Sequence, residues 1–486
     1  MQDGRKGNGR LCPQYLSRGW GKRLPRREER REQAMTKESG FIPPAREIES
    51  HLEEIEHHLS EELVPFWMTH GVDEKYGGFL TYFDRDGKPT GETVKTLICQ
   101  TRMIYAFSRA HLEGFGDGYF FDQALQGAQF VLRHCRDSTR AGYWWTCKRG
   151  GKPLDRKKII YGHSFLIYAL SEFAAACPAA QDEDSETDPA YAALAMAGEC
   201  SETLLTTACD IAHGGFYEFF EEDWEHTPPG VYGGDRKSLD VHMHLMEAFT
   251  NFYDAVDALL PGDWLLEPTR RQAAQIIDLI CERMLHPEFG TGLAQFAPDW
   301  TPLRAIQFKN VWGSDRETDD PEGRPLDNTS YGHNVELGWL LSWAIGVLEL
   351  DREKYAPKIR RLYDHCLKWG IDWDKGGVFC EGPGDGPARE RNKEFWQQAE
   401  ALVAMLDGVE QFGDERCWEG YKNVHRFVMD FVINHDVGEW FALLDENNNV
   451  LWDYMGHAWK INYHTMRSML ECRRRLTRLL DRAKAG

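Results

Sequence analysis

Histidine, carboxylate and arginine side chains recur at six places along the chain, each near the start of an apolar helical pattern. Histidine transfers protons near neutral pH because its ordinary pKa lies close to the working pH. Buried charges need partners, so packing alone does not explain six such groups. We therefore predict that the six segments converge on one site of proton-transfer chemistry. The groups are Gln100 with Arg102; Tyr161 with His163; Asp240 with His244 and Glu247; His333 with Glu336; Trp396 with Glu400; and Trp459 with His464 and Arg467.

Helical spacing predicts which of these side chains point the same way, because residues three or four apart share a helix face. Asp240, His244 and Glu247 are predicted to share a face, with His242 on the opposite side as a structural residue. The same spacing predicts three further pairs, in the first of which the carboxylate would orient the imidazole. These pairs are His333 with Glu336, Trp396 with Glu400, and His464 with Arg467.

The sequence allows two other kinds of chemistry for these residues. One is a metal site made by His244, His333 and His464, although the sequence has no HExxH motif. The other is glycoside hydrolysis by two carboxylates among Asp240, Glu336 and Glu400. A hydrolase has no need for several central histidines, so the residue types favour proton transfer.

The elements that must position these groups follow a repeated turn rich in glycine and aromatic residues. Each turn precedes a few alternating residues and a second turn, which is typical of a short β-hairpin. Two apolar-periodic segments fit between successive hairpins, for example 93–111 and 118–135. The turns lie at 76–79, 142–145, 213–216, 290–293, 376–379 and 438–441.

Six such units predict an all-α fold, a closed (α/α)6 barrel with short β-hairpins at one rim. The helix after each hairpin would line the barrel, with its first half facing that rim. A helical segment at 45–69 would close the ring, and an open superhelix is the alternative.

Composition limits the kinds of partner that the protein can bind and indicates its cellular compartment. A net charge of −21 argues against nucleic acid or an anionic membrane face as a partner. The cysteines stand singly without a CxxC pair, and no apolar run is about 18 residues long, so we expect a cytoplasmic protein without a membrane span. Residues 1–40 are predicted to be a basic, disordered extension, and residues 41–486 a single catalytic domain.

Five motifs follow one another along about residues 45–480. They are Gln100-Thr101-Arg102, the segment 237–248, Tyr331-Gly332-His333-Asn334-Val335-Glu336, the segment 393–400, and the segment 459–464. Together they resemble the N-acylglucosamine 2-epimerase superfamily, and within it the cellobiose 2-epimerases. The chain departs from the disaccharide enzymes at Asp240 (usually Asn), at His163 (often Gln), at Ile461-Asn462 (Cys-Pro), and at Phe395 and Gln397 (Trp and Pro).

The resemblance implies roles for the site residues. His333 and His464 would be general acid/base residues on opposite sides of C2 of an aldose. His244 would assist ring opening and hold the sugar, and Arg102 would stabilise the enediolate oxygen. Trp396 and Trp459 would stack on sugar rings. The remaining expected substrate-binding residues are Asp240, Glu336, Glu400, His163 and Tyr161.

The predicted function is therefore a sugar 2-epimerase that acts through a cis-enediolate, of the type that converts cellobiose to glucosyl-mannose, and needs no cofactor. The expected partner is an oligosaccharide or monosaccharide aldose, bound by a monomer or homodimer. The alternatives are an aldose–ketose isomerase or 2-epimerase acting on monosaccharides such as mannose or N-acylglucosamine, a glycoside hydrolase on the same barrel, and a non-catalytic binding protein.

Overall fold

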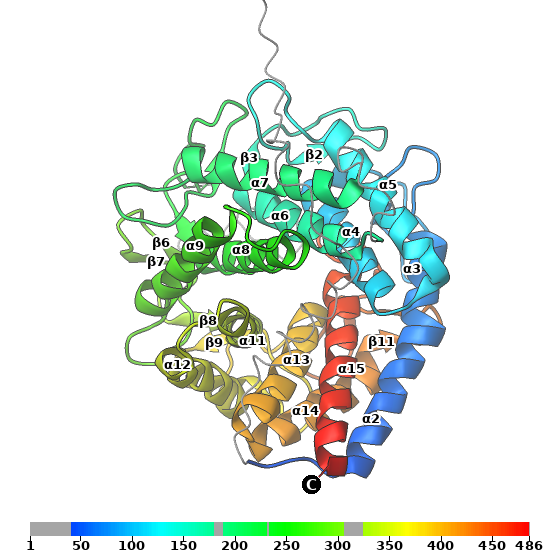
Figure 1. Cartoon of the computed structure of the whole chain (residues 1–486). Coiled ribbons are helices and arrows are strands. Elements are labelled where there is room, and N and C mark those ends of the chain that lie inside the picture. Colours follow the sequence, from blue (N-terminus) through cyan, green and yellow to red (C-terminus); the bar gives the residue numbers. More distant parts are fainter. Residues whose placement is uncertain (1–39, 179–187, 231–232, 306–323, 486) are drawn as a thin grey trace, which may run out of the picture.

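Two concentric rings of helices make up the molecule in a computed structural model, which describes residues 40–178, 188–230, 233–305 and 324–485. In Figure 1 the inner ring surrounds the central axis and the outer ring packs around it. The inner helices are α4 (Leu97–Leu112), α6 (Ile160–Ala176), α8 (Leu239–Leu259), α11 (Tyr331–Val347), α13 (Phe395–Phe412) and α15 (Asn462–Ala485). The outer helices are α2 (Ala45–His57) with α3 (Val64–His70), α5 (Tyr119–His134), α7 (Pro189–Thr207), α9 (Leu266–Leu279), α12 (Arg352–His365) and α14 (Glu415–Phe427).

The inner ring is closed. Each inner helix packs against the next, and α15 returns to pack against α4. The outer partner of α15 is α2, which lies at the other end of the chain, so the predicted segment 45–69 does close the ring. This confirms the closed (α/α)6 barrel and excludes the open superhelix.

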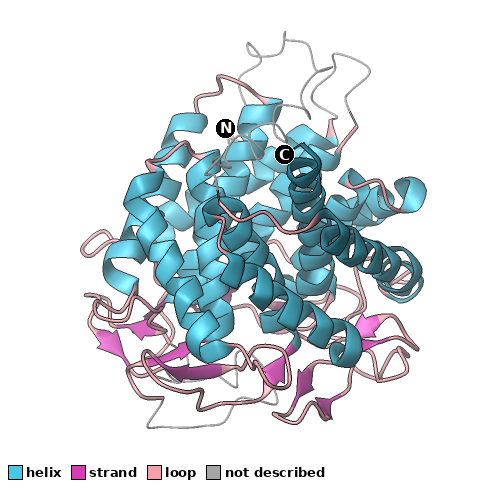
Figure 2. Cartoon of the chain, turned by 90° about the horizontal axis from the view of Figure 1, so that it is seen from below, coloured by secondary structure: helices cyan, strands magenta, loops and turns pink. Residues whose placement is uncertain are grey.

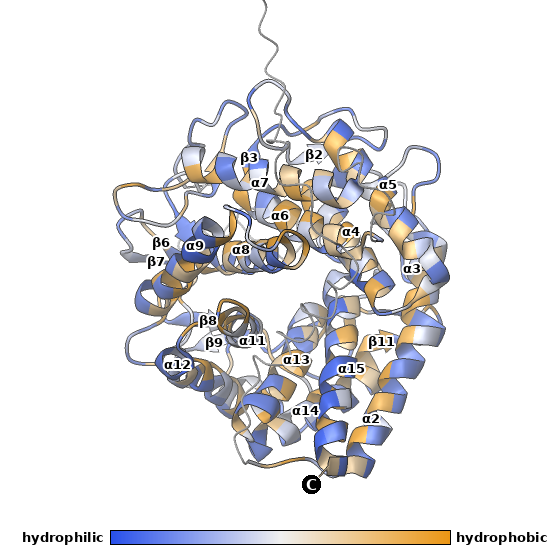
Figure 3. Cartoon of the chain, in the orientation of Figure 1, coloured by the Kyte–Doolittle hydropathy of each residue, from blue (hydrophilic) through white to orange (hydrophobic). Residues whose placement is uncertain are grey.

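Hydropathy distinguishes an inner helix such as α6 from outer helices such as α2 and α14. Every residue of α6 is buried, because this helix is apolar on all sides and touches neighbours on all sides. The outer helices α2 and α14 bury one apolar stripe and expose charged residues, as Figure 3 shows by the blue outer surfaces of these ribbons. Serine or threonine caps begin several inner helices; Ser330, for example, accepts the backbone N–H of His333.

All strands lie at one end of the barrel (Figure 2). The predicted turns form antiparallel bridges there, and local hairpins follow them. Longer-range ladders also join each unit to the next, as in the pairings β1–β2, β3–β4, β5–β6, β8–β9 and β10–β13. The strands are β1 (Lys95–Thr96), β2 (Thr146–Cys147), β3 (Lys158–Ile159), β4 (Phe219–Phe220), β5 (Lys237–Ser238), β6 (Gln295–Phe296), β7 (Pro302–Leu303), β8 (Asn328–Ser330), β9 (Glu381–Pro383), β10 (Lys393–Glu394), β11 (Ile433–Asn434), β12 (Glu439–Trp440), β13 (Leu443–Leu444) and β14 (Val450–Trp452).

The strand rim closes on itself as well. Phe83, in the first unit, bridges Gly456, in the last, and the backbone N–H of Phe83 donates to the Gly456 carbonyl at 3.1 Å. This contact joins residues from opposite ends of the sequence. The strand rim is therefore a closed ring, as the inner helices are. The first halves of the inner helices face this rim.

A buried lysine, two residues before the inner helix, anchors five of the six units. Each lysine ammonium group forms an ion pair with a buried carboxylate of the preceding turn region. The two opposite charges therefore neutralise each other inside the protein. In the fourth unit Thr329 takes the place of the lysine, and its hydroxyl donates to the Gly292 carbonyl. The pairs are Lys95–Asp73 (2.9 Å), Lys158–Asp137 (2.8 Å), Lys237–Asp210 (2.7 Å), Lys393–Asp372 (2.9 Å) and Lys460–Glu439 (3.1 Å).

The remaining sequence expectations concern cysteine, membranes and the extension. The cysteines in the described part of the chain are free thiols, and most of them are buried. No helix among the described residues is long and apolar enough to cross a bilayer. The predicted basic extension covers residues 1–40, of which 1–39 lie outside the described residues.

Candidate active site

A cavity of about 380 Å³ lies at the strand end of the barrel, lined by the first turns of the inner helices and by the hairpins around them. The helices share a register there. Their second and third residues include Tyr161, Asp240, His333, Trp396 and His464, all of which line the cavity. One turn deeper, the sixth residue of each helix gives Arg102, Phe165, His244, Glu336, Glu400 and Arg467.

His333 and His464 lie in the same cavity. The ring centroid of His333 lies 4.7 Å from that of Trp396, and the ring centroid of His464 lies 5.7 Å from that of Trp396. His333 is the third residue of α11, and His464 is the third residue of α15. His333 is about one third exposed, whereas the His464 side chain is almost fully buried. The two imidazoles thus face a common space from two different helices.

His464 is held as a neutral base. Its Nδ1 lies 2.6 Å from a Glu400 carboxylate oxygen, which leaves Nε2 as the other ring nitrogen. Burial lowers the pKa of His464 to about 3, although the Glu400 carboxylate acts in the opposite direction. Burial also opposes the charge on Glu400, but Arg467 and His464 lower the pKa of that carboxyl to about 2. An ionised carboxylate therefore orients an uncharged imidazole.

His244, unlike His464, is held in its protonated form. Its Nδ1 lies 2.8 Å from Glu247, and its Nε2 lies 3.4 Å from Asp240. Burial disfavours the cation, but the hydrogen bonds to Asp240 and Glu247 outweigh it and raise the pKa of His244 to about 9. His244 is therefore an imidazolium at neutral pH, able to donate a proton.

Asp240 connects two histidines. The same carboxylate oxygen that faces His244 lies 3.6 Å from Nε2 of His333. The predicted face shared by Asp240, His244 and Glu247 is thus present. Glu336, however, does not orient His333 as expected, because its carboxylate pairs with Arg467 at 2.8 Å. Asp240 takes that position beside the His333 ring.

Arg467 holds the floor of the cavity together. Its guanidinium pairs with Glu247 at 2.7 Å, with Glu336 at 2.8 Å and with Glu400 at 2.6 Å. Burial and the neighbouring Glu400 raise the pKa of Glu336 to about 8. The result is a buried network in which one arginine fixes three carboxyl groups. Arg467 was expected beside His464, and it acts on that residue through Glu400.

Arg102 is the cation on the opposite wall. It donates to the Tyr161 hydroxyl at 2.8 Å and lies over the rings of Phe165 and Tyr463. Among the described residues no carboxylate forms an ion pair with it, and its Nε is buried without a partner. A guanidinium in this position can stabilise negative charge that develops on a bound molecule.

Aromatic residues form the walls of the cavity. Trp396 and Trp459 both line it, and the centroid of the Trp459 ring lies 5.8 Å from that of Tyr161. The β14 hairpin adds Trp452 and Tyr454, whose rings are nearly parallel with centroids 6.1 Å apart. The expected pairing of Trp396 with Glu400 is wrong, because the Glu400 carboxylate accepts from Trp339 instead.

His163 lies outside the cavity lining, contrary to its expected role in substrate binding. Its Nε2 accepts the backbone N–H of Tyr143, and its Nδ1 faces the Ile159 carbonyl. It is the fourth residue of its helix, and the fourth residues of four other inner helices bind the turn in the same way. These residues are Gln100, His242, Asn334 and Gln398, which accept from Phe79, Phe216, Gly292 and Val378.

Several lining residues escaped the sequence analysis. Glu218 is buried beneath Ser238, and burial raises the pKa of its carboxyl to about 8. Trp452, Tyr454 and His457 also line the cavity. The aromatic run at 452–459, just before the last inner helix, is the signal in the sequence that could have identified these last three residues.

The geometry does not favour a metal site built from His244, His333 and His464, because carboxylates already occupy both nitrogens of His244. Glu336, Glu400 and His464 do bring ligand atoms within 4.8 Å of one another. Arg467 is ion-paired with both of these carboxylates, so a cation would compete with its guanidinium.

Comparison with known proteins places this chain in a defined family. The sequence profile of the N-acylglucosamine 2-epimerase (GlcNAc 2-epimerase) family matches residues 77–468. The chain is 25% identical to a cellobiose 2-epimerase of Dictyoglomus turgidum over 432 residues, which cover 87% of this chain and 98% of that protein. It is 27% identical to a D-mannose isomerase of Marinomonas mediterranea, covering 87% and 97% of the two chains.

The solved structure of the cellobiose 2-epimerase of Spirochaeta thermophila has the same architecture. It superposes with a TM-score of 0.74 at 26% identity, covering 89% of this chain and 98% of that one. The match spans nearly the whole of that structure, so the barrel and its rim correspond from end to end.

Proposed function

We propose, from the premise that this chain belongs to the N-acylglucosamine 2-epimerase family, that it inverts C2 of a reducing-end aldose by proton transfer between two histidines. The observation that carries the mechanism is that His333 and His464 face one cavity from separate helices. Inversion needs one base and one acid on opposite faces of the same carbon, and two independent imidazoles meet that need.

Ring opening comes first. A cyclic aldose has no C1 carbonyl, so its C2 proton is not acidic until the ring oxygen is protonated and the ring opens. The His244 imidazolium is the proton donor in this proposal, supported by the two carboxylates that keep it charged at neutral pH.

Proton abstraction follows from the open-chain aldose. His464 removes the C2 proton through Nε2 in one direction, since its Nδ1 is held by Glu400. The electron pair moves onto the carbonyl oxygen and gives a cis-enediolate, which the Arg102 guanidinium stabilises. His333 then returns a proton to C2 on the other face, and in the reverse direction the two histidines exchange roles.

We propose a disaccharide of the cellobiose type as the substrate. The histidines occupy the helical end of the cavity, and the stacked Trp452 and Tyr454 lie on the hairpin at its rim. A second sugar ring would pack on these aromatic faces while the reducing end reacts below. The similarity to cellobiose 2-epimerases along most of the chain supports this choice.

The second candidate is an aldose–ketose isomerase, which the 27% identity to a D-mannose isomerase favours. The same enediolate gives a ketose when the proton returns to C1 instead of C2. The two activities therefore differ only in the carbon that receives the proton.

Proton NMR in D₂O tests the proposal directly. Cellobiose and mannose are each incubated with the enzyme, and the reducing-end signals are followed. We expect deuterium at C2 of cellobiose and the growth of glucosyl-mannose. Ketose formation from mannose, without C2 inversion of cellobiose, would establish the isomerase instead. A reducing-sugar release from longer glycans without any C2 exchange would overturn both and support hydrolysis.

A further inference from the structure

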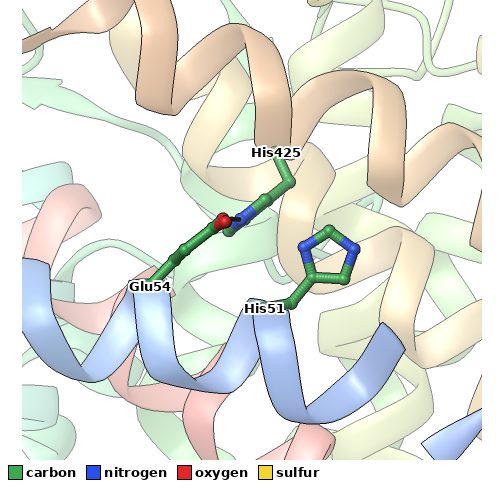
Figure 4. A group of neighbouring side chains, drawn as sticks. All are labelled: His51, Glu54 and His425. Carbon is green, nitrogen blue, oxygen red and sulfur yellow. Dashed lines mark hydrogen bonds and ion pairs between the residues drawn. The ribbon is translucent and has the colours of Figure 1, made fainter. Parts of the chain in front are cut away.

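A second cluster of histidine and glutamate lies in the outer ring, between the helices α2 and α14. His51 and Glu54 are three residues apart on α2, so they share a face. That face packs toward His425 on α14 (Figure 4). Each of the three residues offers one ligand atom, and these atoms all lie within 4.8 Å of one another.

The cluster contains one satisfied pair and one unpaired nitrogen. His425 Nε2 lies 2.6 Å from a Glu54 carboxylate oxygen. Nδ1 of His51 is buried and has no hydrogen-bond partner. In Figure 4 a ring nitrogen of His51 faces the Glu54–His425 pair. A buried nitrogen lone pair directed at a carboxylate and a second imidazole is an arrangement that a cation would complete.

The surroundings hold the two imidazoles in place. The rings of His51 and His425 are 4.5 Å apart, and Trp418 and Tyr421 pack edge-on against His51. The Tyr421 hydroxyl lies 3.4 Å from His425 Nδ1, on the side away from Glu54, and so fixes the ring orientation. Burial lowers the pKa of His51 to about 4, which keeps its nitrogen uncharged and able to bind a metal.

We propose that His51, Glu54 and His425 form a binding site for a divalent transition-metal ion of the Zn²⁺ class. Two imidazole nitrogens and one carboxylate oxygen are ligands that Zn²⁺ accepts, with water in the remaining position. The Glu54 side chain is 52% exposed, so the site opens to solvent. The ion would link α2 to α14 and strengthen the closure of the outer ring. The site is separate from the catalytic cavity, whose residues come from the inner helices.

Metal titration of the full-length protein, freed of metal with a chelator, tests the proposal. We expect one high-affinity Zn²⁺ per chain by calorimetry and a Tm several degrees higher with Zn²⁺. Co²⁺ in the same site should give the visible absorption bands of a four-coordinate ion. His51→Asn should abolish both signals, and Glu54→Gln should weaken Zn²⁺ binding about tenfold or more.

A matched control lies on the same helix. His57 is exposed on α2 and is not part of the cluster, so His57→Asn should bind Zn²⁺ as the wild type does. Epimerase turnover should be unchanged in His51→Asn, because the site does not touch substrate. Zn²⁺ binding that survives His51→Asn, or that is lost in His464→Asn instead, would overturn the proposal by placing the ion elsewhere. Absence of Zn²⁺ binding in the wild type would overturn it as well.

Discussion

Neighbouring carboxylates and burial give two histidines of the cavity different protonation states. His244 has two of them, at Asp240 and Glu247, and its pKa rises to about 9. His464 has one, at Glu400, and burial dominates, so its pKa falls to about 3. Near pH 7 one imidazole is therefore an acid and the other a base. Both rings are buried, so this division of roles follows from the number of neighbouring carboxylates and from the cations Arg102 and Arg467 near His464. The residue types alone do not reveal it.

Replacing either of the two proposed proton-transfer histidines should separate exchange from inversion. His333→Asn and His464→Asn should each lower epimerisation about a thousandfold, within the usual range for a lost general acid or base. Each variant keeps one base, so it should still exchange the C2 proton of one epimer with solvent, and the two variants should choose opposite epimers. Deuterium incorporation by NMR measures this, with circular dichroism to confirm folding. A variant that exchanges neither epimer, or that keeps near-normal turnover, would contradict the two-base mechanism.

Asp240 should set the alkaline limit of activity. The His244 cation persists up to about pH 9, so kcat/KM should fall above that value as the proton is lost. Asp240→Asn removes one of the two carboxylates that raise this pKa, and the alkaline limb should move down by about one pH unit. The pH profile of kcat/KM gives the answer even if the variant is slower at every pH. An alkaline limb that stays in place would show that His244 is not the titrating group.

At the scale of elements, the repeat predicted most of the architecture. Glycine is required in the turns, where Gly142 has a φ of +72°, and the turns divided the chain correctly into six units. The spacing also placed His242 away from the cavity. His163, by contrast, is an expected substrate-binding residue that lies outside the cavity lining. The helix boundaries of the structure show that His163 and His242 are each the fourth residue of an inner helix, where the side chain accepts a backbone N–H of the turn.

His163 provides the test of that structural role. His163→Gln should preserve stability, because a glutamine carbonyl can accept the Tyr143 N–H as Gln100 and Gln398 do in their own units. His163→Leu should leave the buried N–H unpaired and lower the free energy of unfolding by about 1–3 kcal/mol. Denaturant unfolding measures the difference. Neither change should alter KM for the aldose; a large increase in KM for His163→Gln would restore the substrate-binding role.

The shape of the whole molecule depends on contacts that no local pattern encodes. Phe83 and Gly456 meet across the rim although nearly the whole chain separates them. Arg467 reaches Glu247, Glu336 and Glu400 on three different helices. Sequence periodicity places each residue on its own helix face, but the angle between helices decides which side chains meet. The closed ring therefore could be predicted, while the identity of the partners inside it could not.

The charge of the whole molecule should select neutral sugars. The chain carries a net charge of −21, and the cavity lining includes the acidic residues Asp240, Glu381 and Glu394. A sugar phosphate would approach against this field, whereas a neutral aldose is unaffected. We expect kcat/KM for a hexose 6-phosphate to be at least about tenfold below that for the free hexose at low salt.

Ionic strength checks the cause of this preference. Raising it from about 10 mM to about 150 mM shortens the Debye length from about 30 Å to about 8 Å and screens the repulsion. The kcat/KM for the phosphorylated sugar should then rise several-fold while that for the neutral sugar stays constant. A fall with salt for the phosphorylated sugar would mean that local cations such as Arg102 attract it, and that the field at the cavity mouth is positive despite the overall charge.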